Sequence, residues 1–299
     1  DGRGRGLMTA LPNVAEAMPQ VSYRDAEGNE LPADAPVSSI AETVYEIRIR
    51  PGIRYQPHPA FAVDAAGRPR YADLDEASLG DRSQIGDFEY TGTRELDAAD
   101  FAYQIKRLVR PRIESPGLAI FSQIVSLEDL AARLREEVDA GRLNPDGWID
   151  MRRFPLEGVE TPDPHTLRIR IRGKYPQFLN WLATTFVVPV PWEAERFYAQ
   201  PGMARRELTL DMWPVGTGPF MMERNQPLRE IRLVRNPEYR RDLYPCEGEP
   251  GDAEAGLLAD CGKPLPLVDG FRFSYEKEAT PFWNKFLQGY YDIYASTRF

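Results

Sequence analysis

Two segments that lie far apart in the sequence alternate strictly between apolar and charged side chains. In residues 45–50, tyrosine and isoleucine occupy the odd positions and glutamate and arginine the even ones, and residues 167–172 repeat the pattern with leucine, isoleucine and arginine. Successive side chains of a β-strand point to opposite faces of a sheet, so each segment has one face for the core and one for solvent. We expect two antiparallel partners whose arginines face solvent and do not form an anion site.

A third strand with the same alternation is predicted near the end of the chain. Aromatic side chains occupy the odd positions of residues 271–275, with arginine and serine between them. The segment that follows has the signals of a helix: Thr280 is suited to cap it, Pro281 fits its first turn and Gly289 fits its end.

Two more helices are predicted in the middle of the chain. One begins after Asp97 and carries apolar side chains at positions 101, 105 and 108, which share a helix face. The other begins at the capping signal of residues 126–129 and continues with apolar side chains at positions 130, 134 and 138. Strands that alternate with helices in this way indicate an α/β or α+β fold with a mixed sheet.

Two stretches with little periodicity are predicted to be surface insertions. Residues 56–95 are rich in Gly, Asp and Ala, and residues 240–266 are rich in Pro, Gly and acidic side chains. The second contains both cysteines of the chain, Cys246 and Cys261. We expect a disulfide that closes a loop of roughly 15 residues and stabilises it by about 3 kcal/mol. The alternative is two unrelated thiols at the ends of a disordered insertion.

Composition and charge exclude several classes of protein. The net charge is −9, which argues against a nucleic-acid partner that needs a basic face. No stretch is apolar over the roughly 18 to 20 residues that a membrane span requires, and the first residues lack the apolar core of a signal peptide. The protein is therefore either cytosolic, or its sequence here starts downstream of its signal.

Residue types that perform catalysis or bind metal are scarce in this sequence. The two histidines are His58, in a Pro-His-Pro loop, and His165, in a turn after Asp163, and we expect both to be solvated loop side chains. Neither they nor the cysteines have the spacing of a metal site, so no metal and no cofactor is expected. Residues 216–218 resemble a phosphate-binding loop, but Pro219 has no N–H to offer, and a structural turn leading into a strand is the better interpretation.

Six short segments in fixed order resemble one known family. They are I-R-P-G-I-R-Y (49–55), L-D-A-A-D-F (96–101), V-E-T-P-D-P-H-T-L (159–167), P-V-G-T-G-P-F (214–220), R-N-P-E-Y (235–239) and G-Y-Y-D-I (289–293). Together they are similar to the extracytoplasmic solute-binding proteins, family 5, which deliver oligopeptides and dipeptides to ABC importers.

This resemblance implies a type II periplasmic-binding-protein fold of which the sequence holds only the first lobe. The last segment normally lies just ahead of a second lobe, which is missing here. By the same analogy, residues 1–192 form the accessory subdomain of the first lobe, and residues 193–299 form part of its ligand-facing subdomain.

The resemblance also implies where a ligand would be contacted. Relatives place an aromatic side chain directly after a Ser-Pro pair like Ser115 and Pro116, where this sequence has Gly117. They carry another contact residue three positions after the aspartate of the last segment, where this sequence has Ala295. The expected ligand contacts are therefore backbone groups of residues 115–117 and 294–296, with Tyr294 as an aromatic wall beside Ala295 and Ser296.

The function implied is capture of a peptide or similar extended solute between two lobes, and its delivery to an ABC permease in the membrane. Relatives for sugars, nickel chelates and opines leave the solute open. A monomer is expected, periplasmic or otherwise extracytoplasmic, either free or lipid-anchored. Two alternatives from other classes are a hydrolase or lyase that uses carboxylates such as Asp100, Glu160 or Asp163, and a sensory or chaperone module on the same fold.

Overall fold

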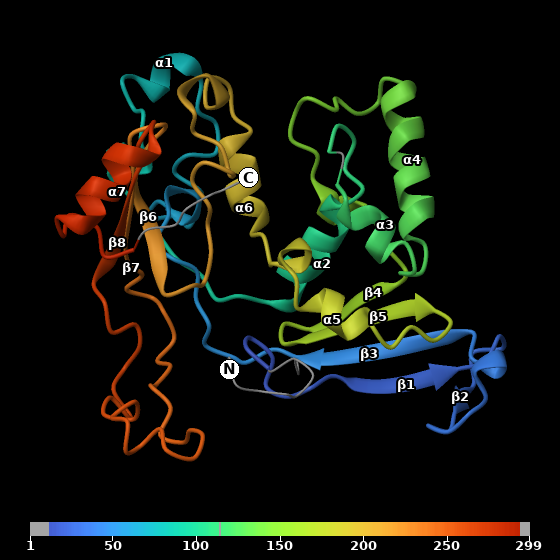
Figure 1. The fold of residues 1–299 in the computed structure, drawn as a ribbon. Helices are drawn as coiled ribbons and strands as arrows, with labels where there is room; N and C mark the ends of the chain where they lie inside the picture. Colours follow the sequence, from blue (N-terminus) through green and yellow to red (C-terminus); the bar gives the residue numbers. More distant parts are fainter. Residues whose placement is uncertain (1–11, 114, 294–299) are drawn as a thin grey trace.

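The computed structural model describes residues 12–113 and 115–293, which form two separate β-sheets with helices beside them (Figure 1). The first sheet has the strand order β2-β1-β3-β5-β4, and the second has the order β6-β7-β8. The strands are β1 (Gln20–Arg24), β2 (Glu30–Leu31), β3 (Glu42–Arg48), β4 (Val159–Asp163), β5 (Thr166–Arg172), β6 (Phe220–Gln226), β7 (Glu230–Arg235) and β8 (Gly270–Ser274).

All strand pairs that the structure describes are antiparallel, so the expectation of a mixed sheet is wrong for this part of the chain. The reason is the connections. β4 and β5 form a hairpin, as do β6 and β7, and a short turn of this kind reverses the direction of the chain. The broader prediction, a fold that combines helices and strands, is confirmed.

The two alternating segments near the start and middle of the chain are neighbours, as predicted. β3 pairs with β5, with Ile47 opposite Leu167 and Glu46 opposite Arg168. The guanidinium of Arg168 donates to the Glu46 carboxylate at 2.9 Å, while Ile169 on the other face is fully buried. The arginines therefore belong to cross-strand ion pairs on the outer face, and the aliphatic face of the sheet is left for the core.

The helices are α1 (Glu76–Leu79), α2 (Ala98–Arg107), α3 (Gly117–Phe121), α4 (Leu127–Asp139), α5 (Phe178–Leu182), α6 (Trp192–Tyr198) and α7 (Ala279–Leu287). α2 begins where the sequence predicts, because Asp97 and Asp100 each accept the backbone N–H of the other. Ser126 holds the N-cap position of α4 but does not cap it. Its φ is +60°, and its hydroxyl lies 3.3 Å from the Glu157 carboxylate instead.

The predicted start of the last helix is wrong by two residues. The N-cap of α7 is Glu278, so that Thr280 and Pro281 lie inside the first turn. The predicted end is confirmed, since Gly289 follows the last helical residues with a φ of +79°, which glycine adopts without steric cost.

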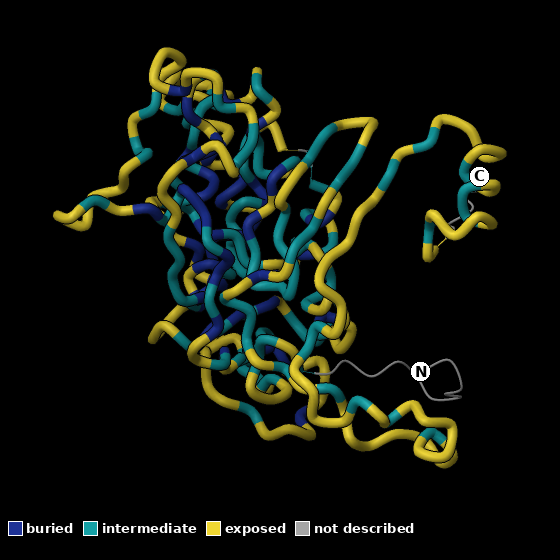
Figure 2. Tube along the Cα trace, turned by 90° about the vertical axis from the view of Figure 1, so that its left-hand side faces the viewer, coloured by how far each residue is buried: buried dark blue, intermediate teal, exposed yellow. Residues whose placement is uncertain are grey.

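One core cluster extends from the first sheet across α2 and α4 to α6 and the loop after it. The buried residues are gathered in the main body of the molecule (dark blue in Figure 2). Residues 56–95 contribute to this core, so the prediction that they form a surface insertion is wrong. His58, Leu79 and Phe88 are all buried, and Phe88 and Phe197 of α6 have ring centroids 5.2 Å apart. These buried residues have no regular spacing in a sequence rich in Gly, Asp and Ala. They share a buried surface because their segment packs against α6.

The other low-periodicity stretch, residues 240–266, is a largely exposed loop that projects from the second sheet (orange in Figure 1). Cys246 and Cys261 are joined there in the disulfide that the sequence predicts, with Cα atoms 4.6 Å apart. Within the loop, the Tyr244 hydroxyl donates to the carbonyl of Leu257 at 2.8 Å. The two cysteines thus close a surface loop that contributes little to the core.

Candidate functional site

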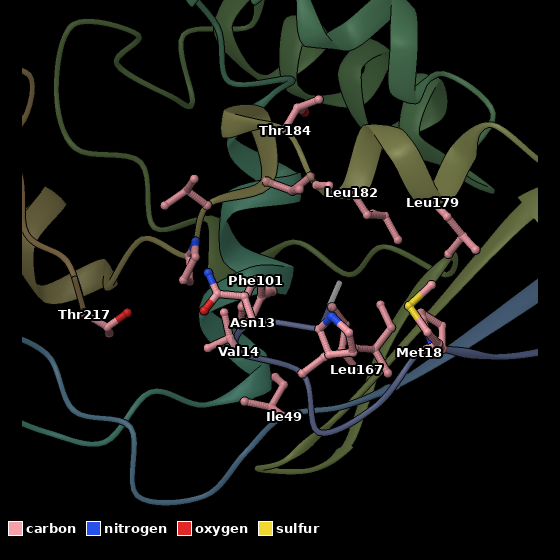
Figure 3. A pocket seen from close by; sticks show the side chains of 18 of the residues that line it. Asn13, Val14, Met18, Ile49, Phe101, Leu167, Leu179, Leu182, Thr184 and Thr217 are labelled. Carbon is pink, nitrogen blue, oxygen red and sulfur yellow. The ribbon is translucent and has the colours of Figure 1, made fainter. Parts of the chain in front are cut away.

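An apolar cavity of about 570 Å³ lies between the inner face of the first sheet and the turn before β6 (Figure 3). Its lining comes from seven separate stretches of the chain: residues 12–19, residues 47–49 at the end of β3, residues 101–105 of α2, residues 167–169 of β5, residues 179–189, residues 217–219 and residues 239–240. The side chains labelled in Figure 3 include Val14, Met18, Ile49, Phe101, Leu167, Leu179 and Leu182.

The sheet wall of this cavity follows from the alternation in the sequence. Ile47 and Leu167 lie directly opposite each other on β3 and β5, and Ile169 follows on the same face. Because odd positions point inward on both strands, the wall is aliphatic throughout, while the ion-paired arginines lie on the outer face. Phe101 and Ile105 of α2 form the adjoining wall, one helical turn apart.

The turn before β6 forms the opposite wall, and hydrogen bonds on both sides hold it in place. The carbonyl of Gly216 accepts the backbone N–H of Gln56 at 2.9 Å, and the N–H of Gly216 donates to the side-chain oxygen of Gln56 at 3.2 Å. Asn236 donates its side-chain amide to the carbonyl of Gly218 and its backbone N–H to the carbonyl of Pro219, both at 2.9 Å. This confirms the prediction that residues 216–219 are a structural turn leading into a strand.

The rim of the cavity is polar, and its charge is already balanced. Arg240 is the one charged side chain among the described lining residues, and its guanidinium lies 3.0 Å from the Asp242 carboxylate and also contacts the side-chain oxygen of Asn13. Asp242 also accepts the hydroxyl of Tyr239 at 2.6 Å. Partial burial, together with this hydrogen bond, raises the pKa of Tyr239. Among the described lining residues, no charged side chain is left unpaired to attract an ion.

Of the six predicted ligand contacts, only Ser115, Pro116 and Gly117 fall within the described residues. Residues 294–296 lie outside them. Gly117 is buried against the ring of Phe186, and a Cβ added to Gly117 would lie 3.1 Å from a carbon of that ring. The backbone N–H of Gly117 donates to the Ser115 hydroxyl at 3.2 Å. These residues do not line the cavity, although Val187, next to Phe186 in the chain, does.

The histidines have different environments. His165 lies in the turn between β4 and β5 with its side chain 37% exposed, as expected of a loop histidine. The expectation for His58 is wrong, because its side chain is buried against Phe197 and Tyr198 of α6. Burial lowers the pKa of His58 to about 3, so this residue is a neutral part of the core at physiological pH.

The three carboxylates considered for acid–base chemistry each have a structural partner. Asp100 forms an ion pair with Arg94 at 2.6 Å, Glu160 with Arg168 at 3.0 Å, and Asp163 accepts the hydroxyl of Thr166 at 2.7 Å within its hairpin. Ion pairing and capping account for all three without a catalytic role.

A partly buried ion-pair cluster joins α6 to α2 and to the segment before α2. Arg94 contacts both Asp100 of α2 and Glu193 of α6, and its guanidinium lies 5.1 Å from the ring centroid of Tyr55. Glu195 of α6 is buried and accepts from Arg107 and Arg110 at 2.8 and 2.7 Å. These contacts fasten α6 to α2, which carries one wall of the cavity.

Residues 12–113 and 115–293 contain neither a cluster of metal ligands nor a helix suited to span a membrane. Nowhere in these ranges do three or more histidine, cysteine or carboxylate side chains gather in a way that could hold a metal ion. None of the helices there has the length and apolar character that crossing a membrane requires.

A second apolar surface is open to solvent at the end of the described chain. The aromatic side chains of β8 and the residue after it are 40–51% exposed, and Leu287, Tyr290 and Ile293 beyond them are 63–75% exposed. The alternation that predicts β8 is therefore correct, but its aromatic face does not join the core of the described residues. Figure 2 shows the terminal segment set apart from the buried body of the molecule.

Sequence reasoning did not find the cavity. A signal for part of it exists in residues 178–190, where aliphatic and aromatic side chains recur without an amphipathic period. Six other stretches must meet to form the rest, and no local pattern predicts that they meet.

Comparison with known proteins identifies a relationship for most of the chain. The profile of bacterial extracellular solute-binding proteins, family 5 (middle part), matches residues 87–298. A candidate ABC transporter peptide-binding protein of Brucella ovis is 28% identical over 89 residues, which are 28% of this chain and 16% of that protein. A protein of the same description from Brucella abortus matches equally well.

Two solved structures have a similar fold. The pheromone receptor PrgZ, whose structure was determined together with its mode of peptide binding, matches with a TM-score of 0.50 and 18% identity over 93% of this chain. Clavulanic acid biosynthesis oligopeptide binding protein 2 matches with a TM-score of 0.51 and 17% identity over 95% of this chain. The chain spans 37% and 34% of the lengths of these two proteins.

Proposed function

The chain belongs to the bacterial extracellular solute-binding proteins, family 5, and from this premise we propose that the protein captures a peptide or similar extended solute between two lobes and delivers it to an ABC permease. The family match over residues 87–298 carries the proposal. The family is one of binding proteins and not of enzymes, which agrees with the structural partners of Asp100, Glu160 and Asp163.

We assign residues 1–192 to an accessory subdomain and residues 193–299 to the ligand-facing part of one lobe. The strands support this division, because the five-stranded sheet falls in the first range and the three-stranded sheet in the second. The two parts share a core, with Phe197 and Trp213 in the same cluster as Ile169. The accessory subdomain would thus act as a fixed support for the ligand-facing part.

Enclosure of the solute needs a second wall, which we propose is formed by a part of the protein outside these 299 residues. The exposed aromatic surface of β8 and α7 supports this, since apolar side chains such as Phe273 gain stability when they are covered. Closing two lobes around a solute would remove its polar groups from water on both sides and pair them with protein groups. Ser115, Pro116, Gly117 and residues 294–296 are the contacts that we propose from this lobe.

The proposed location is outside the cytoplasm, where a family described as extracellular operates. The partner there would be a membrane permease, which exchanges the solute when the lobes open. Oligopeptides are the proposed solute because the Brucella relatives are described as peptide-binding and PrgZ was solved with its mode of peptide binding.

Uptake and native mass spectrometry test this proposal on the full-length protein. Deleting its gene should lower the uptake of labelled oligopeptides by the host, and the purified protein should carry a peptide mass that denaturation releases. Unchanged uptake of peptides, together with a bound solute of another class, would overturn the peptide assignment. Unchanged uptake of every solute tested, with no bound mass, would overturn the transport function itself.

A further inference from the structure

The cavity between the first sheet and the turn before β6 is separate from the residues proposed to contact a solute between lobes. Its volume, about 570 Å³, lies within the roughly 300 to 1,000 Å³ that small-molecule sites occupy. Neither Ser115 nor Gly117 lines it. We propose that this cavity is a second binding site, which takes an uncharged and mainly aliphatic small molecule.

The side chains that line the cavity determine the chemistry of the ligand. Aliphatic or aromatic groups cover the floor and both sides, among them Ile49, Leu167 and Leu182 (Figure 3). Water in such a space makes few hydrogen bonds, so an apolar molecule that displaces it is favoured. Few polar side chains are available to a ligand, and they include the hydroxyl of Thr217 near the rim.

The balanced charge at the rim excludes an ionic ligand. Arg240 is held by Asn13 and by both carboxylate oxygens of Asp242, and Asp242 Oδ2 also accepts the Tyr239 hydroxyl. An anion that entered would have to displace Asp242 from Arg240, and a cation would find no unpaired carboxylate among the described residues that line the cavity. Moving an unpaired charge from water into apolar surroundings is costly, so the neutral form of a ligand should bind much more tightly than its charged form.

Strand pairing and hydrogen bonds fix the positions of the walls, so the cavity does not collapse when it is empty. The β3–β5 ladder fixes one wall, and the hydrogen bonds of Gln56 and Asn236 fix the turn that forms the other. The ion pair between Arg94 and Glu193 fixes α6 to the segment before α2. A site whose walls are already in place loses little conformational entropy when it binds.

Fluorescence of N-phenyl-1-naphthylamine, an uncharged apolar dye, tests the proposal on the 299-residue chain. The dye should bind saturably with a stoichiometry of one. 1-Octanol should displace it, whereas octanoate should compete at least about tenfold more weakly. Equal competition by the two compounds would overturn the assignment of an uncharged ligand.

Two variants locate the dye. Leu182→Trp fills the cavity from α5 and should weaken dye binding at least about tenfold. Ala183→Trp fills it from the adjacent, more exposed position and serves if the first variant does not fold, as judged by circular dichroism and thermal unfolding. Unchanged affinity in a folded variant of either kind would overturn the proposal.

The exposed aromatic face of β8 is the competing site for an apolar dye, and Phe273→Ser is the matched control. Phe273 is 50% exposed and does not line the cavity, so this variant should leave the affinity unchanged. Loss of dye binding in Phe273→Ser, with retention in Leu182→Trp, would place the dye on the sheet and overturn the proposal. None of these outcomes depends on peptide uptake, so the result is distinguishable from a failure of the transport function.

Discussion

The Nε2 atom of His58 lies 2.8 Å from the phenolic oxygen of Tyr198, and both side chains are buried. The proton positions follow from their other partners. His58 Nδ1 accepts the backbone N–H of Ala60, and the Tyr198 hydroxyl donates to the carbonyl of Trp213 at 2.7 Å. His58 Nε2 must therefore carry the proton and donate it to Tyr198. These hydrogen bonds connect the loop at residue 58 to α6, and connect α6 to the segment that leads into the turn before β6.

Stability should fall in acid because of His58. Burial lowers the pKa of His58 to about 3 in the folded protein, against 6.5 for an unperturbed histidine, so the unfolded chain binds the proton more readily. The contribution of His58 is complete above pH 6.5 and is lost as the pH falls toward 3, by about 1.4 kcal/mol in free energy of unfolding for each pH unit.

Urea unfolding at several pH values between 7.5 and 4.5 checks this prediction. His58→Gln keeps a neutral amide that can hydrogen-bond but does not titrate. The wild-type protein should lose more stability than this variant as the pH falls, and equal slopes for the two proteins would show that His58 is not the responsible group.

Tyr198→Phe should destabilise the protein by about 1–3 kcal/mol, since it removes the hydroxyl that satisfies both His58 and the Trp213 carbonyl in a buried site. Tyr290→Phe is the matched control, because Tyr290 is 74% exposed and its change should have almost no effect. Chemical denaturation of both variants measures the difference. A similarly small loss in both would mean that the buried hydroxyl bonds are unimportant.

The disulfide between Cys246 and Cys261 should be intact in the oxidised protein and local in its effect. Thiol titration of the unreduced, denatured chain should find no free thiol, and two reactive groups would refute the pairing. After reduction, proteases should cut residues 247–260 faster, because closure of a loop this long stabilises it by about 3 kcal/mol. The thermal unfolding of the core should change little, since the loop is exposed.

The 299-residue chain should bind no peptide with useful affinity. One lobe offers a solute contacts on one side only, so its polar groups gain little over water. Calorimetry with tripeptides to pentapeptides should show no binding tighter than about 1 mM, or roughly −4 kcal/mol. Micromolar binding would mean that the peptide site lies wholly within these residues and that the two-lobe proposal is wrong.

Local patterns in the sequence determined much of the secondary structure and the family. The alternation in residues 45–50 and 167–172 predicts two strands and their outward arginines, and Asp97 predicts the start of α2, because these features depend on neighbours in the chain. The six ordered segments indicate the family through their resemblance to its members, and the family match over residues 87–298 confirms it. Even so, Ser126 shows the limit, since a tertiary contact with Glu157 takes the hydroxyl that its sequence assigns to capping.

Only the tertiary structure decided the burial of His58 and the existence of the cavity. Pro-His-Pro has the composition of an exposed loop, and it is buried because α6, some 140 residues later, packs against it. The cavity needs residues 12–19, two strands, α2 and the turn before β6 to meet while leaving space between them. Periodicity and capping depend on interactions between residues close together in the chain. Burial and cavity volume depend on which distant segments pack against each other, and no local pattern in a single sequence predicts that packing.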